Sequence, residues 1–260
     1  MNAEPEAESA VLTDRRGRIL TITINRPEQR NAVNAAVAAG IAGALEELDG
    51  DAGLSVGVLF GVGKGFCAGM DLKAFVTGER PFIPGRGFAG ITQRSADKPL
   101  IAAVEGFALA GGLEVALACD LIVAARGARL GIPEVKRSLF AAGGGLLRLP
   151  RALPRNVAME MALTGDPIGA ERAHDLGLVN RLADPGHALD VALELAETIA
   201  ANGPVALAAT KRILVESSDW PDSEFFERQG PIYDQVFSSE DAREGATAFA
   251  ERRAPEWKGR

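Results

Sequence analysis

The first half of the chain alternates short apolar runs with segments of helical periodicity. Residues 18–25 read RILTITIN, an alternating run bounded by charged and turn residues that predicts a strand. Asn34 is a good cap for a helix ending near Gly50, because apolar residues recur every three or four positions after it. The same criteria predict strands at 54–60, 100–104 and 121–125 and a helix at 111–118. This alternation indicates an α/β domain with parallel strand pairing.

The pattern changes after Leu146, where helical periodicity takes over. Predicted helices cover residues 156–163, 169–176, 188–201, 205–216, 223–237 and 241–252. A helical C-terminal third indicates a cap or a contact between subunits. Residues 78–90 hold several Gly and Pro, so they predict a mobile loop.

The composition limits the classes of binding partner and the cellular compartment that we expect for this protein. The formal net charge of -7 argues against general nucleic-acid binding, which depends on Lys and Arg. Cys67 and Cys119 form no CxxC pair, and His174 and His187 lie far from both, so we expect neither a disulfide framework nor a zinc site. Residues 1–9 lack the apolar core of a signal peptide, and no apolar run reaches the roughly 18 residues of a membrane span. We therefore expect a cytoplasmic protein without a membrane partner.

Two glycine-rich segments follow predicted strands. One strand runs into Ala110-Gly111-Gly112 and then into a helix, so backbone N–H groups can approach a ligand closely at a helix N-terminus and hold an oxyanion. Residues 65–73, GFCAGMDLK, form a second loop of the same kind, and each loop can direct one N–H at the same oxygen. Ordinary turn chemistry is the alternative explanation of these glycines.

Other motif matches lack the context that they need. The GxxxxGK[ST] spacing of a phosphate loop is absent, because Lys64 is followed by Gly65. The GxGxxG match at residues 85–90 follows a Pro-rich loop rather than a strand, so we treat it as chance. Cys67 has no histidine or acid placed to activate it, which favours a structural cysteine.

Two carboxylates have apolar surroundings in the sequence. Glu114 falls in the first turns of the glycine-led helix, and Glu134 follows a short predicted strand in Gly131-Ile-Pro-Glu-Val135. Burial at such positions would raise a carboxyl pKa toward the range that suits proton transfer. A capping or surface glutamate is the alternative for each.

Together these segments resemble the enoyl-CoA hydratase/isomerase, or crotonase, family over nearly the whole chain. The segments that carry the resemblance are Asn25-Arg26-Pro27, Asn31–Asn34, Cys67–Lys73, Ala103–Asp120, Gly131–Val135, Ala248–Arg253 and Trp257–Arg260. Each fragment is weak evidence alone, whereas the ordered set at the family's spacing is strong evidence.

The resemblance implies an oxyanion hole made by the N–H groups of Met70 and Gly111. It implies that Glu114 orients and helps to deprotonate the water added to the β-carbon, and that Glu134 exchanges the proton at the α-carbon. Hydratases keep both acids at a separation of 20 positions, as here. The expected function is therefore hydration of a 2-enoyl-CoA thioester, with no metal or redox cofactor.

The resemblance also implies how coenzyme A, carried as part of the substrate, is bound and how the chain is built. The matching positions are Arg26, Ala68, Gly69, Asp71 and Leu72, together with Phe249 and Arg252 from the C-terminal helix of a neighbouring subunit. A solvated helix charge is the alternative for Arg252. The implied fold is a spiral of ββα units over residues 1–195 and a helical trimerisation region over residues 196–260. A homotrimer or a dimer of trimers is expected.

Two departures and four rival functions remain open at this point. Many hydratases carry Pro-Gly-Ala-Gly-Gly-Thr after the second glutamate, but residues 140–146 read FAAGGGL, so Ala141 and Ala142 replace the Pro-Gly pair near the water. Residues 81–86 also differ, in the region that shapes the acyl pocket. The rivals are double-bond isomerisation, dehydration of a polar acyl-CoA such as carnitinyl-CoA, non-catalytic acyl-CoA binding and RNA binding. Retention of both glutamates argues against binding alone, and the acidic total argues against RNA.

Overall fold

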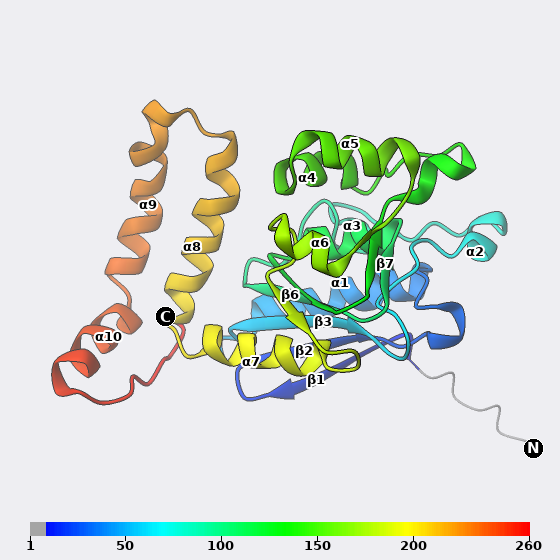
Figure 1. Ribbon diagram of the computed structural model, residues 1–260. Coiled ribbons are helices and arrows are strands. Elements are labelled where there is room, and N and C mark those ends of the chain that lie inside the picture. The colour runs from blue at the N-terminus through cyan, green and yellow to red at the C-terminus, as the bar shows by residue number, and fades with distance from the viewer. Residues whose placement is uncertain (1–8) are drawn as a thin grey trace, which may run out of the picture.

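A six-stranded sheet organises the chain, which a computed structural model describes over residues 9–260 (Figure 1). The strand order is β1-β2-β3-β6-β8-β11, with β1 antiparallel to β2 and every other neighbouring pair parallel. These strands are β1 (Val11–Arg16), β2 (Ile19–Ile24), β3 (Val56–Gly61), β6 (Leu100–Val104), β8 (Leu121–Ala125) and β11 (Arg181–Ala183). The expectation about a signal peptide falls mostly on residues 1–8, outside the described part.

A smaller sheet lies beside the first. After β6 and after β8 of the large sheet, the chain continues into a strand of this smaller sheet. Its order is β10-β9-β7, with β7 parallel to β9, and an isolated parallel bridge joins Cys67 to Ala108 of β7. A separate hairpin pairs two further short strands. The strands of these two sheets are β7 (Phe107–Leu109), β9 (Arg129–Gly131), β10 (Ile168–Gly169), β4 (Phe82–Ile83) and β5 (Gly87–Phe88).

Successive turns of the chain repeat one pattern: a strand in the large sheet, an extended segment in the small sheet, then a helix. β6, β7 and α3 form one such unit, and β3, the segment around Cys67 and α2 form the preceding unit. The helices are α1 (Ala35–Gly50), α2 (Leu72–Val76), α3 (Gly111–Ala118), α4 (Gly145–Ala152), α5 (Arg155–Thr164), α6 (Ala170–Asp175), α7 (Ala188–Ala200), α8 (Pro204–Glu216), α9 (Phe225–Phe237) and α10 (Glu240–Glu251). Short 3-10 helices are η1 (Pro27–Gln29), η2 (Pro133–Arg137), η3 (Ser217–Asp219) and η4 (Asp222–Glu224).

The core lies on both faces of the large sheet because the central strands are apolar on both sides. All six residues of β2 are buried. On one face α1 packs with Leu20, Ile22 and their neighbours. On the other face α7 presents only alanines at its fully buried positions, which lets this helix lie close to β3 and β6. Burial of apolar area on this scale is the main stabilising contribution to the fold.

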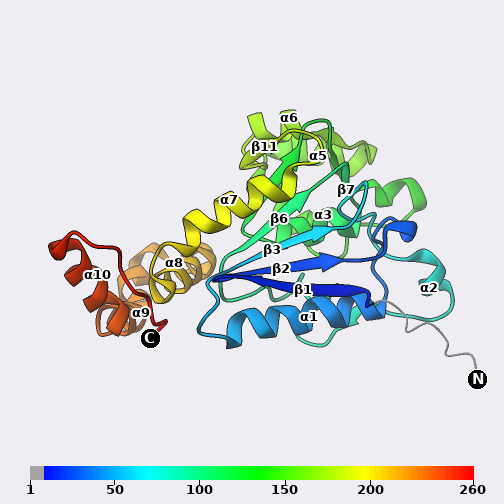
Figure 2. The same ribbon diagram turned by 90° about the horizontal axis from the view of Figure 1, so that it is seen from below.

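The last three helices, α8, α9 and α10, stand apart from the sheets as an arm (Figures 1 and 2). Lys211 of α8 ties the arm to the core, because its Nζ lies 2.7 Å from Oδ2 of Asp120 at the end of α3. The arm exposes large apolar side chains, which favours a protein contact there. These side chains are Leu214, Val215, Phe226, Tyr233, Phe237 and Phe249. The predicted boundary at residues 195 and 196 falls inside α7, which packs on the sheet along its length.

The structure agrees with most predicted elements and corrects one. The helix predicted at residues 111–118 matches α3 to the residue. Residues 78–90, predicted as a loop, contain the hairpin β4–β5, so the GxGxxG match lies in a hairpin and not between a strand and a helix.

Among residues 9–260, no single helix is long and apolar enough to cross a membrane, and α7 with α8–η3 meets that criterion only as a pair bent by 107°. The same residues contain no group of three or more potential metal ligands of the His, Cys, Asp and Glu types.

Candidate active site

Met70 and Gly111 lie together because they follow equivalent positions of neighbouring parallel strands. Cys67 bridges Ala108, and Ala108 pairs with Leu130 of β9. Three residues further along each segment the chain reaches Met70, Gly111 and Pro133 respectively. Parallel strands in register end at the same edge of a sheet, so both N–H groups and Glu134 emerge at one edge.

The two backbone donors are left free of protein acceptors. Neither the Met70 N–H nor the Gly111 N–H donates a hydrogen bond to another atom within residues 9–260. The loops touch, because a Cβ added to Gly69 would lie 3.0 Å from the Gly111 nitrogen. Ala110, the residue before α3, has φ 53° and ψ -131°, a sparsely populated conformation that costs about 1–3 kcal/mol. Free N–H groups at a helix N-terminus, held by a strained backbone, suit an oxyanion.

Glycine is required where α3 meets the preceding turn. A Cβ on Gly112 would lie 2.1 Å from the carbonyl oxygen of Cys67, and a Cβ on Gly111 would lie 2.5 Å from the Phe88 ring. The Cys67 thiol is fully buried and accepts the Gly69 N–H at 3.3 Å. Burial raises the pKa of this thiol to about 12. Cys67 is therefore a structural residue, as predicted.

Glu114 lies on α3 with 4% of its surface exposed. Its Oε1 accepts the N–H of Gly145, the first residue of α4, at 2.8 Å. A Cβ on Gly143 would lie 2.6 Å from Oε2, so the backbone of this segment lies directly against the carboxylate. We call residues 143–145 the glycine cradle. Burial raises the pKa of Glu114, whereas the N–H groups of Gly145 and Gly143 and the charge of Arg148 act in the opposite direction.

Glu134 lies on η2 in a different environment. Burial raises the pKa of Glu134 to about 7, and the charge of Glu114 adds to this effect. The Glu134 Oε2 atom is buried and has no hydrogen-bond partner within the part of the chain that the structure describes. An unpaired, buried carboxyl oxygen with a pKa near neutrality can exchange a proton with a bound molecule. Glu134 and Glu114 are thus close enough for their charges to interact.

Arg26 and Asp71 are bound to each other. Nη2 of Arg26 lies 3.0 Å from Oδ2 of Asp71, and Nη1 of Arg26 donates to the Ala32 carbonyl at 2.5 Å. Asp71 also caps α2 by accepting the N–H groups of Lys73 and Ala74. Burial would raise the pKa of Asp71, but the Ala74 N–H and Arg26 outweigh this and lower it. Both side chains therefore position the loop that bears Met70.

The remaining predicted coenzyme A positions fall in two places. Ala68 and Gly69 lie on the Met70 loop, where the Ala68 N–H donates to the Arg30 carbonyl at 3.1 Å, and Leu72 is exposed beside them. Phe249, 89% exposed, and Arg252 lie at the end of α10 in the arm, away from α2 and α3 (Figure 1). A single chain thus brings together the catalytic candidates and the Met70 loop, but not the arm residues.

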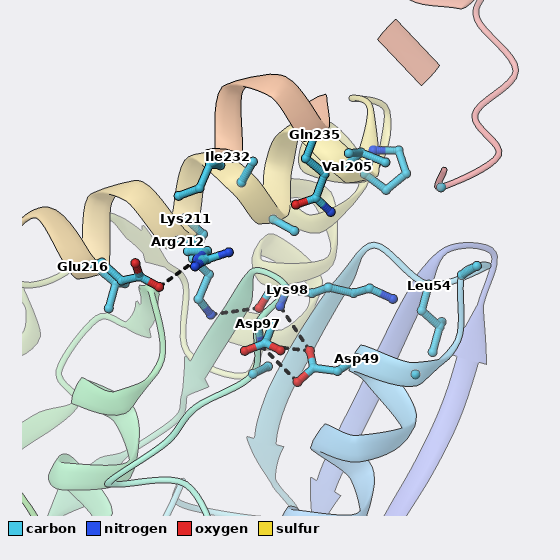
Figure 3. A pocket seen from close by; sticks show the side chains of 18 residues that line it. Asp49, Leu54, Asp97, Lys98, Val205, Lys211, Arg212, Glu216, Ile232 and Gln235 are labelled. Carbon is cyan, nitrogen blue, oxygen red and sulfur yellow. Dashed lines mark hydrogen bonds and ion pairs between the residues drawn. The ribbon is translucent and has the colours of Figure 1, made fainter. Parts of the chain in front are cut away.

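A cavity lies elsewhere, between α8 and the end of α1 (Figure 3). It has a volume of about 630 Å³. Its charged groups already have partners: Asp49 accepts the N–H groups of Asp97 and Lys98, and Arg212 pairs with Glu216. This cavity contains neither candidate glutamate, and its paired charges offer no reactive group.

The structure adds residues that were not predicted as site residues. Gly143 and Gly145 contact Glu114 through their backbones, and Arg148 contributes the charge that faces it. The sequence signal for these residues is the run of three glycines at 143–145, directly after the two alanines that replace the Pro-Gly pair. Ala141 is buried and Ala142 exposed, so the replaced Pro-Gly pair precedes the cradle without belonging to it.

Two free backbone donors, a buried glutamate and a half-buried glutamate on a ββα spiral form the arrangement expected of a crotonase-type enzyme. Comparison with known proteins agrees. The family described as enoyl-CoA hydratase/isomerase matches residues 14–260. The chain belongs to this family.

Three relatives illustrate the range of the similarity. A crystal structure of enoyl-CoA hydratase from Mycobacterium tuberculosis H37Rv is 63% identical, with a TM-score of 0.95 over 97% of this chain and 100% of that chain. Enoyl-CoA hydratase EchA19 of M. tuberculosis is 41% identical over 99% of this chain and 100% of its own length. Carnitinyl-CoA dehydratase of Escherichia coli K12 is 44% identical over 98% of this chain and 100% of its own length. These similarities confirm the crotonase-like fold predicted from the sequence.

Proposed function

We propose that this protein catalyses the reversible addition of water across the 2,3 double bond of a 2-enoyl-CoA thioester. The observation that carries this proposal is a pair of neighbouring carboxyl groups in opposed environments beside two unpaired backbone donors. Glu114 accepts a backbone hydrogen bond and feels the charge of Arg148, whereas Glu134 is half-buried and its buried Oε2 atom has no partner among the described residues. Pairs of acids whose surroundings differ in this way can take separate acid and base roles.

The oxyanion hole activates the double bond. The N–H groups of Met70 and Gly111 donate to the thioester carbonyl oxygen, which makes the β-carbon electrophilic. Attack at that carbon moves charge onto the oxygen as an enolate. Donors that are already oriented stabilise this charge without reorganising, and one such donor contributes about 3 kcal/mol in other enzymes.

The two glutamates move the protons. Ionised Glu114 removes one proton from the water whose oxygen bonds to the β-carbon, and protonated Glu134 delivers a proton to the α-carbon as the enolate collapses. The pair then holds its single proton on Glu114, so dehydration uses the same states in reverse. This scheme requires only proton transfers, and no metal or redox cofactor takes part in it.

Binding of the coenzyme A moiety follows from the same proposal. The Met70 loop, with Ala68, Gly69 and Leu72, contacts the coenzyme beside the oxyanion hole, and the Arg26–Asp71 pair fixes this loop. Phe249 and Arg252 of a neighbouring subunit supply the phosphate contact. Their distance from the catalytic candidates in one chain, and the exposed apolar side chains of the arm, support assembly as a homotrimer or a dimer of trimers. A cytoplasmic location is part of the proposal.

The test is hydration of crotonyl-CoA, followed as loss of the conjugated enoyl-thioester absorbance. We expect wild-type turnover, with a decrease of about 10²- to 10⁴-fold in both Glu114→Gln and Glu134→Gln. Glu160→Gln, which removes an exposed glutamate of α5, is the matched control and should keep wild-type rates. Full turnover in either site variant would refute the catalytic assignment. Absence of wild-type turnover despite tight binding of CoA thioesters would refute the proposed reaction.

Dehydration of a polar acyl-CoA is a second candidate, favoured by the similarity to carnitinyl-CoA dehydratase. It uses the same two acids in the reverse direction. Comparing kcat/KM for crotonyl-CoA and for carnitinyl-CoA separates the two. A preference of tenfold or more for carnitinyl-CoA would establish the second candidate in place of the first.

A further inference from the structure

We propose that Arg148 is a positioning residue that holds the glycine cradle against Glu114 and places a fixed positive charge beside it, so that Glu114 serves as the base of the reaction. The inference rests on the proposed function for its catalytic meaning. Its geometric part concerns only the contacts of Arg148 with the segments around Glu114.

The guanidinium of Arg148 folds back over the start of its own helix. Its Nη2 donates to the Thr92 carbonyl at 2.7 Å, and its Nη1 makes a long contact of 3.5 Å with the Gly143 carbonyl. A Cβ on Gly144 would lie 2.2 Å from Nη1, and φ of Gly144 is +99°. Glycine at this position therefore leaves room for the guanidinium to lie directly on the cradle.

The cradle contacts Glu114 from its other side. Gly145 donates its N–H to Glu114 Oε1, and the Gly143 backbone lies against Oε2. Arg148 thus connects the segment at Thr92 to the residues that hold the carboxylate. Losing the guanidinium would release the Gly143 carbonyl and leave the Thr92 carbonyl without this donor. A small displacement of a catalytic group can cost about 100-fold in rate.

The charge of Arg148 acts on Glu114 in addition to the geometry. Burial raises the pKa of Glu114 and the positive charge of Arg148 lowers it. The other titratable groups around this pair are Glu134 on η2, Cys119 after α3 and Arg151 on α4. Burial raises the pKa of Glu134, so Glu134 holds its proton more readily than an ordinary glutamate. A fixed cation near Glu114 stabilises the ionised form of Glu114, and the proton shared by the pair therefore lies on Glu134. An arginine keeps its charge throughout the working range of pH.

The experiment compares Arg148→Gln, which removes the charge, with Arg148→Lys, which keeps a charge but loses the guanidinium fork. Arg151→Gln, an exposed arginine one turn along α4, is the matched control. The dependence of kcat/KM on pH is measured with crotonyl-CoA. Carbon-13 NMR of glutamate-labelled protein follows the titration of Glu114 without substrate, with Glu114→Gln to assign its signal.

For Arg148→Gln we expect a loss of kcat/KM of about 10- to 100-fold. The acid limb of its pH profile and the NMR titration of Glu114 should both move to higher pH. Arg148→Lys should keep the wild-type acid limb with a smaller loss of rate, and Arg151→Gln should match wild type. An unmoved Glu114 titration in Arg148→Gln would overturn the proposal, as would equal losses in the Gln and Lys variants at every pH.

Two complications are separated by the design. Should Arg148→Gln not fold, Arg148→Met keeps the alkyl stem and its packing and serves the same comparison. Should wild type fail to hydrate any enoyl-CoA, the proposed function fails, but the NMR titration still decides whether Arg148 sets the protonation of Glu114.

Discussion

Replacing Glu134 by Gln should make the folding stability of this protein less dependent on pH. Burial raises the pKa of Glu134 from its ordinary value of 4.5 to about 7. Since the pKa is raised in the folded state, the folded protein binds this proton more tightly than the unfolded chain does. The resulting stability is fully present below pH 4.5 and is lost as the pH rises through about 7. Gln cannot titrate, so this loss is absent in the variant.

The size of the effect follows from the two pKa values. The difference between 4.5 and about 7 corresponds to about 3.4 kcal/mol when it is fully realised. The Glu134 side chain is only partly buried, so solvent screens the interaction, and we reduce the value by somewhat more than half, to about 1.5 kcal/mol. The unfolding free energy of Glu134→Gln relative to wild type should therefore rise by about 1.5 kcal/mol between pH 4.5 and pH 8.

The measurement is urea unfolding of both proteins at several pH values and one fixed protein concentration, because the stability of an oligomer, as proposed above, depends on concentration. Taking the difference at each pH removes every titration that the two proteins share, and following the change of that difference with pH removes any constant cost of burying the Gln amide. Glu160→Gln provides the control for loss of a glutamate. A difference that stays constant from pH 4.5 to pH 8, or falls, would refute the proposed environment of Glu134.

Three further predictions test the loops and the arm. Gly112→Ala should lower stability by about 1–3 kcal/mol and reduce kcat, because its Cβ would lie 2.1 Å from a carbonyl oxygen, whereas Gly43→Ala on α1 has open space and should be neutral or stabilising in thermal unfolding. Arg26→Ala should cost about 2 kcal/mol in urea unfolding, because half-buried Asp71 would lose its partner, and restored stability in Arg26→Ala with Asp71→Ala would confirm the coupling. Arg252→Gln should raise KM for crotonyl-CoA about tenfold at unchanged kcat, and an equal rise for crotonyl-pantetheine, which lacks the nucleotide phosphates, would contradict a phosphate contact.

Most strands of the large sheet were predictable because each is a short apolar run that can be recognised in the sequence. Residues 19–24 form a strand whose apolar run is bounded by polar residues, and α3 begins where glycine gives way to a helical run. β1 was not predicted, because VLTDRR is mostly polar and its strand lies at the edge of the sheet. α4 was also missed, since it begins after three glycines and contains Pro150, both of which predict a break in helical structure.

The candidate site was predictable only in part, because some of its residues have reactive side chains and others contribute only backbone groups. Glu114 and Glu134 are carboxylates in apolar segments, so they could be nominated from the sequence and then given roles by the family resemblance. Gly143 and Gly145 act through backbone groups, which every residue has. Arg148 is one of 28 basic residues, and nothing in its neighbours indicates that its side chain turns back toward α3. Their contribution depends on packing between α3 and α4, which spacing along the chain does not encode.

The repeated ββα unit explains why residues distant in sequence form one site. Each ββα unit adds one parallel segment to the small sheet. The residues that follow these segments therefore lie side by side along one edge of that sheet. Successive turns place Met70, Gly111 and Glu134 there, as two donors followed by an acid. Glu114 joins them from the first turns of α3, and the glycine cradle of the following segment closes on it. Ala141 and Ala142 precede the cradle, so the loss of the Pro-Gly pair leaves its contacts with Glu114 intact. A substitution at Gly143 should therefore impair turnover far more than one at Ala142, although Ala142 is the position that departs from the hydratase pattern.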